Sequence, residues 1–451
     1  MNEEKIDLLA NEKVVKAILK LAIPMIMGMM VQVLYNLVDT YFIGQLGDAN
    51  QLAAANLALP IFVLLMGIAS MIGTGASSYI SRCLGKNDYE QVNQTTSIAV
   101  ALLAGIGLVV TLLGIIFLKP IVRALGASNQ VYVYTYQYAF IMILGAVVVI
   151  GNFAYSQLLR AEGSAIKSMI GMMIGTVLNL ILDPLFIFTF GLGVTGAALA
   201  TIIGNLGGFI YYSLCFMKGQ TTIKIKFKLM KIDKKILGEI FKIGIPSSLT
   251  QILAGTATIV ANNIGALYGV ETVAGFGVAT KIILIGTFIF IGFSSGCQPL
   301  IGYNYGAGNF ERVKEIIKKG SWLTTTIGVV LLVLFTLCSS FLISIFIKDE
   351  EVIRIGTIIL RAILWSLPFL GRQFIATVAV QSMGKAIPAI ILSISRQGIL
   401  YIPMCILLNS VFGFYGFIFA QPLVDVMMNL FAKIYMIRLM HRETVTLEIP
   451  S

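Results

Sequence analysis

Residues 98–118 read IAVALLAGIGLVVTLLGIIFL, with a single polar side chain, that of Thr111, and no charged residue. A helix of roughly 20 apolar residues is long enough to cross the hydrocarbon core of a bilayer. Similar stretches recur along the 451-residue chain, in which 58% of the residues are hydrophobic, 12% are charged and the mean hydropathy is +0.92. A soluble enzyme of this length needs more polar residues to cover its surface. The sequence therefore predicts an all-α membrane protein that crosses the bilayer many times.

The hydrophobic stretches predict twelve transmembrane helices. We place them at residues 17–43, 52–80, 95–118, 131–157, 166–189, 194–217, 239–267, 273–300, 320–346, 353–381, 386–409 and 411–437. The last two stretches are nearly continuous, and the Phe-Gly-Phe-Tyr-Gly segment at residues 412–416 supplies the turn signal that separates them. The first 20 residues are too polar for a cleaved signal peptide, so we expect the first apolar segment to remain as a membrane anchor.

The distribution of positive charge predicts the orientation of the chain. If the N-terminus is cytoplasmic, the segments on the cytoplasmic side carry 23 Lys and Arg residues and the outer loops carry four. Cytoplasmic loops of membrane proteins are enriched in these residues, so we expect a protein of the bacterial cell membrane with both termini in the cytoplasm. Seven of the lysines lie in residues 218–238, which we interpret as a solvated linker near anionic lipid headgroups. No aromatic platform or motif indicates a nucleic-acid partner.

The sequence repeats itself with an offset of 221 residues. Residues 85–92 (GKNDYEQV) align with residues 306–313 (GAGNFERV), and each half of the chain holds six predicted spans. Because six is an even number, the halves have parallel topology, as in transporters built from two repeats around a central cavity. The predicted domains are an N-terminal six-helix lobe at 1–217, the basic linker at 218–238 and a C-terminal six-helix lobe with a short cytoplasmic tail at 239–451.

A few polar side chains lie inside the predicted spans of the N-terminal lobe. The pairs that share a helix face are Asn36 with Asp39, Asn179 with Asp183, and Thr201 with Asn205. An ionisable residue at membrane depth costs on the order of 2.5–3.5 kcal/mol on insertion scales, so it indicates a functional site by default. Two simpler interpretations remain open: Asp39 lies near the outer interface, or Asp183 is a packing residue beside Pro184.

These side chains suggest two kinds of chemistry. A carboxyl group that is removed from water, or that lies beside a second one, is protonated more easily and can carry a proton. Carboxylate, amide and hydroxyl oxygens can instead hold a small hard cation such as sodium. Substrate-cavity candidates are Tyr35, Asn36, Asn152, Asn205 and Lys281. The acids are not repeated in the C-terminal lobe, which instead contains Arg361, Arg372, Arg396 and Asp425, and we assign no role to these four residues.

Several classes of function are excluded by missing motifs. The chain has no Gly-x-x-x-x-Gly-Lys-Ser/Thr phosphate loop, which argues against a built-in ATPase. Its single histidine, His441, lies in the tail, which excludes a catalytic triad and a histidine metal site. The five cysteines are scattered and odd in number, so they form neither a disulfide framework nor a zinc motif. We expect no enzyme activity, no cofactor and no resident metal.

The whole chain resembles the multidrug and toxic compound extrusion (MATE) family of transporters. The resemblance covers the length, the twelve spans, the doubled lobe and the segment LGKNDYE at residues 84–90. It is greatest to the bacterial branch that contains the DNA-damage-inducible protein F and the staphylococcal-type multidrug exporter. This resemblance implies that Asp39 and Asp183 act in ion coupling, with Asn179 and Thr201 as the neighbouring polar positions of a cation site. Spans seven and ten contain no embedded acid, unlike the sodium-driven branch.

The expected function is secondary-active export of amphipathic organic cations and drugs in antiport with protons or sodium. The 19 methionines and the 46 aromatic residues are suited to a soft, polarisable cavity wall, although they also fill any membrane helix bundle. One alternative is a lipid or lipid-linked sugar flippase of the same superfamily, which the cations Lys281, Arg361, Arg372 and Arg396 keep open. A receptor or scaffold is disfavoured, because no loop approaches the size of a domain.

Overall fold

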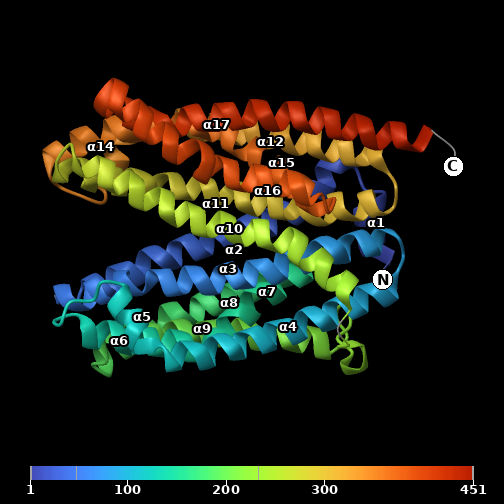
Figure 1. Cartoon of the computed structure of the whole chain (residues 1–451), viewed down its shortest axis with the longest axis horizontal. Helices are drawn as coiled ribbons and strands as arrows, with labels where there is room; N and C mark the ends of the chain where they lie inside the picture. The colour runs from blue at the N-terminus through green and yellow to red at the C-terminus, as the bar shows by residue number, and fades with distance from the viewer. Residues whose placement is uncertain (1–2, 47, 232, 449–451) are drawn as a thin grey trace. The chain divides into compact units, whose positions relative to one another are not determined.

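The computed structural model describes residues 3–46, 48–231 and 233–448, and within these ranges every regular element is a helix (Figure 1). The chain divides into two compact units. Unit 1 comprises Met1–Ile6 and Met27–Ser248, and unit 2 comprises Asp7–Ile26 and Leu249–Ser451. The fold is therefore an all-α membrane protein with two helical lobes, as the sequence predicts.

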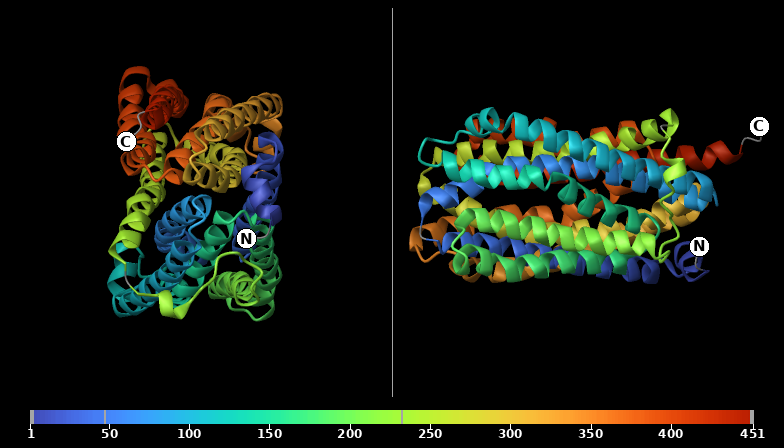
Figure 2. Two further views of the ribbon diagram at one scale, coloured as in Figure 1. Left: turned by 90° about the vertical axis from the view of Figure 1, so that its right-hand side faces the viewer. Right: turned by 90° about the horizontal axis from the view of Figure 1, so that it is seen from below.

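Unit 1 is a bundle of long helices, which Figure 2 shows along their axes and from the side. Its elements are parts of α1 (Glu3–Ala10), α2 (Val14–Gly44) and α10 (Lys234–Ala266), with α3 (Ala49–Gly85), α4 (Tyr89–Ile116), α5 (Leu118–Ala124), α6 (Tyr132–Leu144), α7 (Ala146–Ala161), α8 (Ala165–Pro184), the π-helix η1 (Leu185–Thr189), α9 (Gly193–Met217) and η2 (Phe227–Leu229). Unit 2 holds the remaining parts of α1, α2 and α10, with α11 (Val270–Gly306), α12 (Phe310–Leu337), α13 (Ser339–Ser344), α14 (Glu350–Ile363), η3 (Leu364–Ser366), α15 (Leu367–Ser382), α16 (Ala386–Ile394), the π-helix η4 (Ser395–Tyr401) and α17 (Ile402–Glu448).

The predicted number of membrane spans agrees with the helices. Within the described ranges, ten helical stretches are long and apolar enough to cross a membrane, and α6 with α7 qualifies as an eleventh, bent by 53°. One of the ten, Ala386–Arg442, is 57 residues long. Gly413 inside it has φ 59° and ψ −138°, which is not helical. This glycine lies in the predicted turn and breaks the stretch into two, which gives twelve.

Two of the connections that the sequence places on the cytoplasmic side are shorter than predicted. Helix α4 begins at Tyr89 rather than at residue 95, because Asp88 accepts a hydrogen bond from the backbone N–H of Gln91 (3.0 Å). Helix α12 begins at Phe310 rather than at residue 320, and Asn309 caps it in the same way. Such caps satisfy the free N–H groups of the first turn, so the helices continue beyond their apolar residues. The two caps are 221 residues apart, so the structure repeats with the sequence.

Helices α2 and α10 each contribute to both units. Pro24 and Pro246 stand two residues before the points where these helices change unit, after Ile26 and Ser248. A proline removes one backbone hydrogen bond of the helix and is a common cause of a bend. The predicted lobes follow the sequence repeat, at 1–217 and 239–451, whereas the packing units exchange these two helix segments.

Glycines explain why the exchanged segments pack where they do. In unit 2, a Cβ atom placed on Gly296 would lie 2.6 Å from the backbone of Ala22. In unit 1, a Cβ atom placed on Gly244 would lie 1.9 Å from the carbonyl oxygen of Met71. Any larger residue would separate the helices, so each exchanged segment is fixed by a close backbone contact.

Candidate functional site

The crossing of α8 and α9 brings the predicted polar residues together in unit 1. A Cβ atom placed on Gly204 of α9 would lie 2.6 Å from the carbonyl oxygen of Gly175 on α8 and 3.0 Å from Cβ of Asn179. Glycine at both positions allows the two backbones to come this close. Asn179 and Asp183 are four residues apart and share one face of α8. Thr201, three residues before Gly204, lies on the facing side of α9.

Asp39 of α2 and Asp183 of α8 are directed at each other. Their carboxyl groups lie within hydrogen-bonding reach. Asp183 is fully buried, Asp39 is half-buried, and among the described residues no Lys or Arg forms an ion pair with either. Two carboxyl groups bond to each other only when one of them carries a proton. The pair is therefore a place where a proton can be held inside the bundle.

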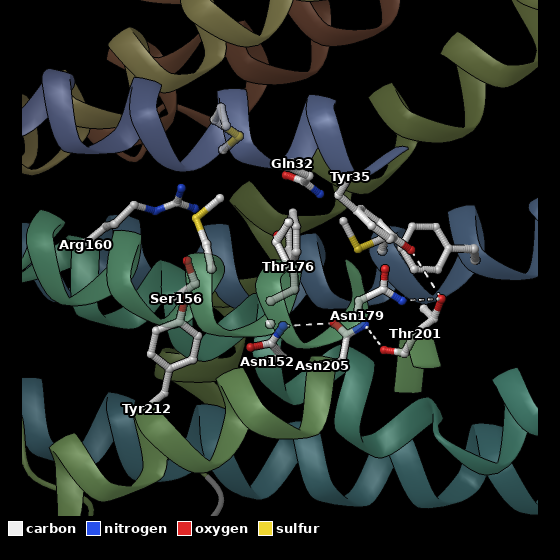
Figure 3. Close-up of a pocket in the computed structure, with 16 residues that line it drawn as sticks. Gln32, Tyr35, Asn152, Ser156, Arg160, Thr176, Asn179, Thr201, Asn205 and Tyr212 are labelled. Carbon is white, nitrogen blue, oxygen red and sulfur yellow. Dashed lines mark hydrogen bonds between the residues drawn. The ribbon is translucent and has the colours of Figure 1, made fainter. Parts of the chain in front are cut away.

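Asn179 connects the acid pair to α9. Its Nδ2 donates to Oδ1 of Asp183 over 3.3 Å and to Oγ1 of Thr201 over 3.4 Å. With the amide turned by 180°, it donates to Oδ2 of Asp183 over 3.0 Å and accepts from the backbone N–H of Thr201 over 3.0 Å. Only the turned orientation satisfies both amide atoms, because in the other one the amide oxygen lies beside Oδ2 of Asp183, which is also an acceptor. Thr201 Oγ1 also lies 3.2 Å from the hydroxyl of Tyr35 on α2 (Figure 3).

A cavity inside unit 1 adjoins this network. It encloses about 720 Å³, part of it open to solvent, and the predicted residues that line it are Tyr35, Asn152, Asn179, Thr201 and Asn205 (Figure 3). Nδ2 of Asn152 donates to Oδ1 of Asn205 (2.9 Å), and Nδ2 of Asn205 donates to the carbonyl oxygen of Thr201 (2.8 Å). A chain of polar groups thus runs from α7 through α9 to the acid pair.

Two predicted cavity residues do not join this group. The side chain of Asn36 lies outside the part of the chain that the structure describes. Lys281 is exposed on α11 in unit 2 and is not among the residues that line the cavity of unit 1. The charge of Lys281 therefore does not contribute to the lining of the unit 1 cavity.

The cavity also has polar lining residues that the sequence did not single out. They are Gln32, Ser156, Arg160, Thr176 and Tyr212. Asn152, Ser156 and Arg160 follow one another at four-residue intervals on α7, which is the spacing of one helix face. This spacing, together with the polar face of α8, could have indicated from the sequence that α7 also lines the cavity.

Unit 2 pairs its buried acid with a cation. Nε of Arg396 lies 2.8 Å from Oδ1 of Asp425, which is fully buried, and Gln421 also donates to this carboxylate. Arg361 donates to Oγ of Ser339 (2.8 Å). Arg396 lines a small cavity of unit 2, whereas Arg361, Arg372 and Lys281 are not among its lining residues. The four cations therefore do not gather into one basic pocket there.

The side chains that most often bind metal ions are dispersed in the described residues. No group of three or more His, Cys, Asp and Glu side chains gathers there as metal ligands. All five cysteines are free, and Cys83, Cys215, Cys297 and Cys405 are buried.

Two repeated helical units and an acid pair beside a cavity together define a polytopic membrane transporter. Residues 24–185 and 246–407 match the family model MatE, one match in each half of the chain. The multidrug export protein MepA of Staphylococcus aureus strain MRSA252 is 34% identical over 445 residues, which cover 99% of this chain and 98% of that protein. MepA of Staphylococcus saprophyticus is 33% identical over 445 residues, with the same coverage.

Solved structures agree with these relatives. The crystal structure of MATE in complex with MaL6 has a TM-score of 0.94 and 25% sequence identity, and the match covers 98% of this chain and 99% of that one. A transporter of the MOP superfamily from Pyrococcus furiosus, described as having a binding pocket of reverse polarity, has a TM-score of 0.91 and 26% identity, with the same coverage. The chain belongs to the MATE family of multidrug and toxic compound extrusion transporters.

Proposed function

We propose that this transporter exports amphipathic organic cations and drugs in exchange for protons, and that Asp39 and Asp183 are the groups that carry the proton. The observation behind this proposal is the contact between the two carboxyl groups in the interior of unit 1. Antiport needs a site that the proton and the substrate occupy in turn, because otherwise one could move without the other. A proton-sharing acid pair next to a cavity meets that requirement.

The physical basis is the cost of burying charge. When both carboxyl groups are ionised, two negative charges face each other in a partly dry interior, which is unfavourable unless a cation compensates. Either a proton or a cationic substrate in the adjoining cavity provides this compensation. Uptake of a proton from outside would then favour release of the cation, and loss of the proton to the cytoplasm would favour its binding.

The direction of the Asn179 amide supports a proton rather than sodium. In the orientation that satisfies both of its polar atoms, its nitrogen faces Asp183, so the nearest amide group offers a donor where a sodium ion would require an oxygen. The hydroxyl of Thr201 is already within hydrogen-bonding distance of Tyr35. Sodium coupling remains an outcome that the experiment below distinguishes.

Apolar lining residues support an amphipathic substrate. The cavity wall includes Met29, Met66, Met172, Phe62 and Phe153. Thioether and aromatic groups are polarisable and adapt to ligands of different shape, and aromatic faces attract cations. The relatives whose names describe multidrug export fit the same substrate class. With both termini in the cytoplasm, as the basic loops indicate, export runs from the side that carries the linker.

The decisive experiment uses purified protein in proteoliposomes that contain a pH-sensitive dye. Addition of ethidium should produce substrate-driven proton movement in the wild-type protein, with no dependence on sodium. Asp183→Asn should remove this movement while the protein still elutes as a single folded species. Asp88→Asn is the matched control, because asparagine caps helix α4 as well as aspartate does.

Three results would argue against the proposal. Proton-coupled ethidium movement that survives in Asp183→Asn would exclude Asp183 from coupling. Ethidium movement driven by a sodium gradient alone would replace the proton with sodium. A wild-type protein that moves no drug but transfers lipid-linked sugars between leaflets would favour the flippase alternative.

A further inference from the structure

Arg160 is a buried cation at one end of the unit 1 cavity. Its side chain lies near the C-terminus of α7, is 5% exposed and lines the cavity. Among the described residues it forms no ion pair, and its Nε atom is buried without a hydrogen-bond partner. A guanidinium group is always charged, so its burial is unfavourable unless another group compensates the charge.

The acidic residue nearest to Arg160 in the sequence already pairs with another cation. Glu162, two residues after Arg160, is fully buried and binds Nζ of Lys5 over 2.8 Å. Its other carboxylate oxygen accepts hydrogen bonds from the backbone N–H groups of Thr222 and Ile223. The carboxylate of Glu162 therefore holds α1 and the linker and leaves Arg160 unpaired.

The polar side chains of the cavity lie between Arg160 at one end and the acid pair at the other. Asn152, Ser156 and Arg160 line one face of α7, and the backbone rises about 12 Å between the first and the last of them. Figure 3 shows Arg160 at the opposite end of the cavity from Asn179 and Thr201, which adjoin the acid pair. A cation placed beside Arg160 is repelled, whereas an anion there is attracted.

On the basis of the proposed export function, we propose that Arg160 binds the carboxylate of amphipathic zwitterionic substrates, whose cationic centre is directed toward Asp39 and Asp183. A guanidinium group forms two parallel hydrogen bonds with a carboxylate, which gives both strength and orientation. Such a substrate fills both charged ends of the cavity, and the methionine and phenylalanine side chains between them contact its apolar body. A substrate with only a cationic charge uses the acid end alone.

Two dyes that differ in one ester test this inference. Rhodamine 110 has a free carboxylate and a cationic ring system, and rhodamine 123 is its methyl ester. Arg160→Gln should weaken binding of rhodamine 110, measured by fluorescence polarisation, about tenfold or more, since it loses hydrogen bonds between charged groups. Binding of rhodamine 123 should change less than twofold. In proteoliposomes the KM for rhodamine 110 should rise while its kcat is largely kept.

Two further variants separate recognition from folding. Arg160→Lys keeps the charge and loses the planar fork, so its affinity for rhodamine 110 should lie between those of wild type and Arg160→Gln. It also keeps the test valid if Arg160→Gln fails to fold. Lys167→Gln removes a positive charge from the same end of the lobe, and its amine bonds the backbone carbonyl of Gln220 outside the cavity lining. This control should bind both dyes as the wild type does.

If Arg160→Gln lost affinity for both dyes equally, the inference would be overturned, because this result would indicate that Arg160 only supports the fold. Unchanged binding of rhodamine 110 in Arg160→Gln would overturn it as well. The coupling proposal fails in a different way. If Asp183→Asn still exchanged both dyes for protons, the acid pair would lose its role, while the discrimination at Arg160 would stand.

Discussion

The crossing of α8 and α9 at Gly204 allows a sharp test of how packing sets the coupling site. In Gly204→Ala, the new Cβ atom would lie 2.6 Å from the carbonyl oxygen of Gly175 and 3.0 Å from Cβ of Asn179. Ordinary contacts of this kind begin near 3.4 Å, so the backbones must separate by several tenths of an ångström. Overpacking of this size lowers the free energy of unfolding by about 1–3 kcal/mol. In a unit of this size each kcal/mol lowers Tm by about 2–4 °C.

The same displacement should impair transport. The bond between Asn179 of α8 and Thr201 of α9 crosses between the two helices and is 3.4 Å long, or 3.0 Å with the amide turned, so a separation of several tenths of an ångström weakens or breaks it. Gly207→Ala is the matched control, three residues further along α9. Its Cβ atom would meet Cδ1 of Leu178 at 2.3 Å, and a flexible side-chain end can move. Thermal unfolding in detergent and ethidium-driven proton movement measure both effects. Equal Tm and equal transport in the two variants would refute the reasoning.

Three other substitutions should have distinct effects. Gly244→Ala places a Cβ atom 1.9 Å from a carbonyl oxygen of α3 and should lower Tm, whereas Gly238→Ala, which meets nothing within 4 Å, should not. Glu162→Ala releases the linker, so trypsin should cleave the lysines of residues 218–231 faster than in the wild type. Arg396→Met leaves the buried carboxylate of Asp425 without its cation and should lower the free energy of unfolding by about 3–5 kcal/mol. The double variant with Asp425→Leu leaves no buried charge, so its free energy of unfolding should fall less. Denaturant titrations measure both values.

Most of the fold follows from hydrophobic stretches, because a bilayer requires long apolar segments whatever their neighbours are. The positions of the twelve spans and the turn at Gly413 could be read in this way. Short helices such as α5 and α13 were not predicted, since seven and six residues give little periodicity. The exchange of helix segments at Pro24 and Pro246 was also missed, because it depends on contacts between residues far apart in the sequence.

The candidate site was predictable where one helix alone provides the pattern. Asn179 and Asp183 share a face of α8, and their contact is present. The meeting of Asp39 with Asp183 joins α2 to α8; the polar residues suggested a carboxylate cluster, but the pattern of a single helix could not place these two helices side by side. Arg160 was counted as one of many cytoplasmic positive charges, because the sequence does not show that its acidic neighbour Glu162 is bound to Lys5.

The shared helices α2 and α10 have a consequence for biosynthesis. Residues 7–26 leave the ribosome long before the residues that follow Ser248, yet they belong to the same packing unit as those later residues. Residues 234–248 likewise finish the first bundle late. Neither lobe can therefore reach its final packing before the other has been synthesised. The amino-terminal segment lacks its packing partners during most of translation. A chain cut in the linker would yield two fragments, each holding a piece that the other needs.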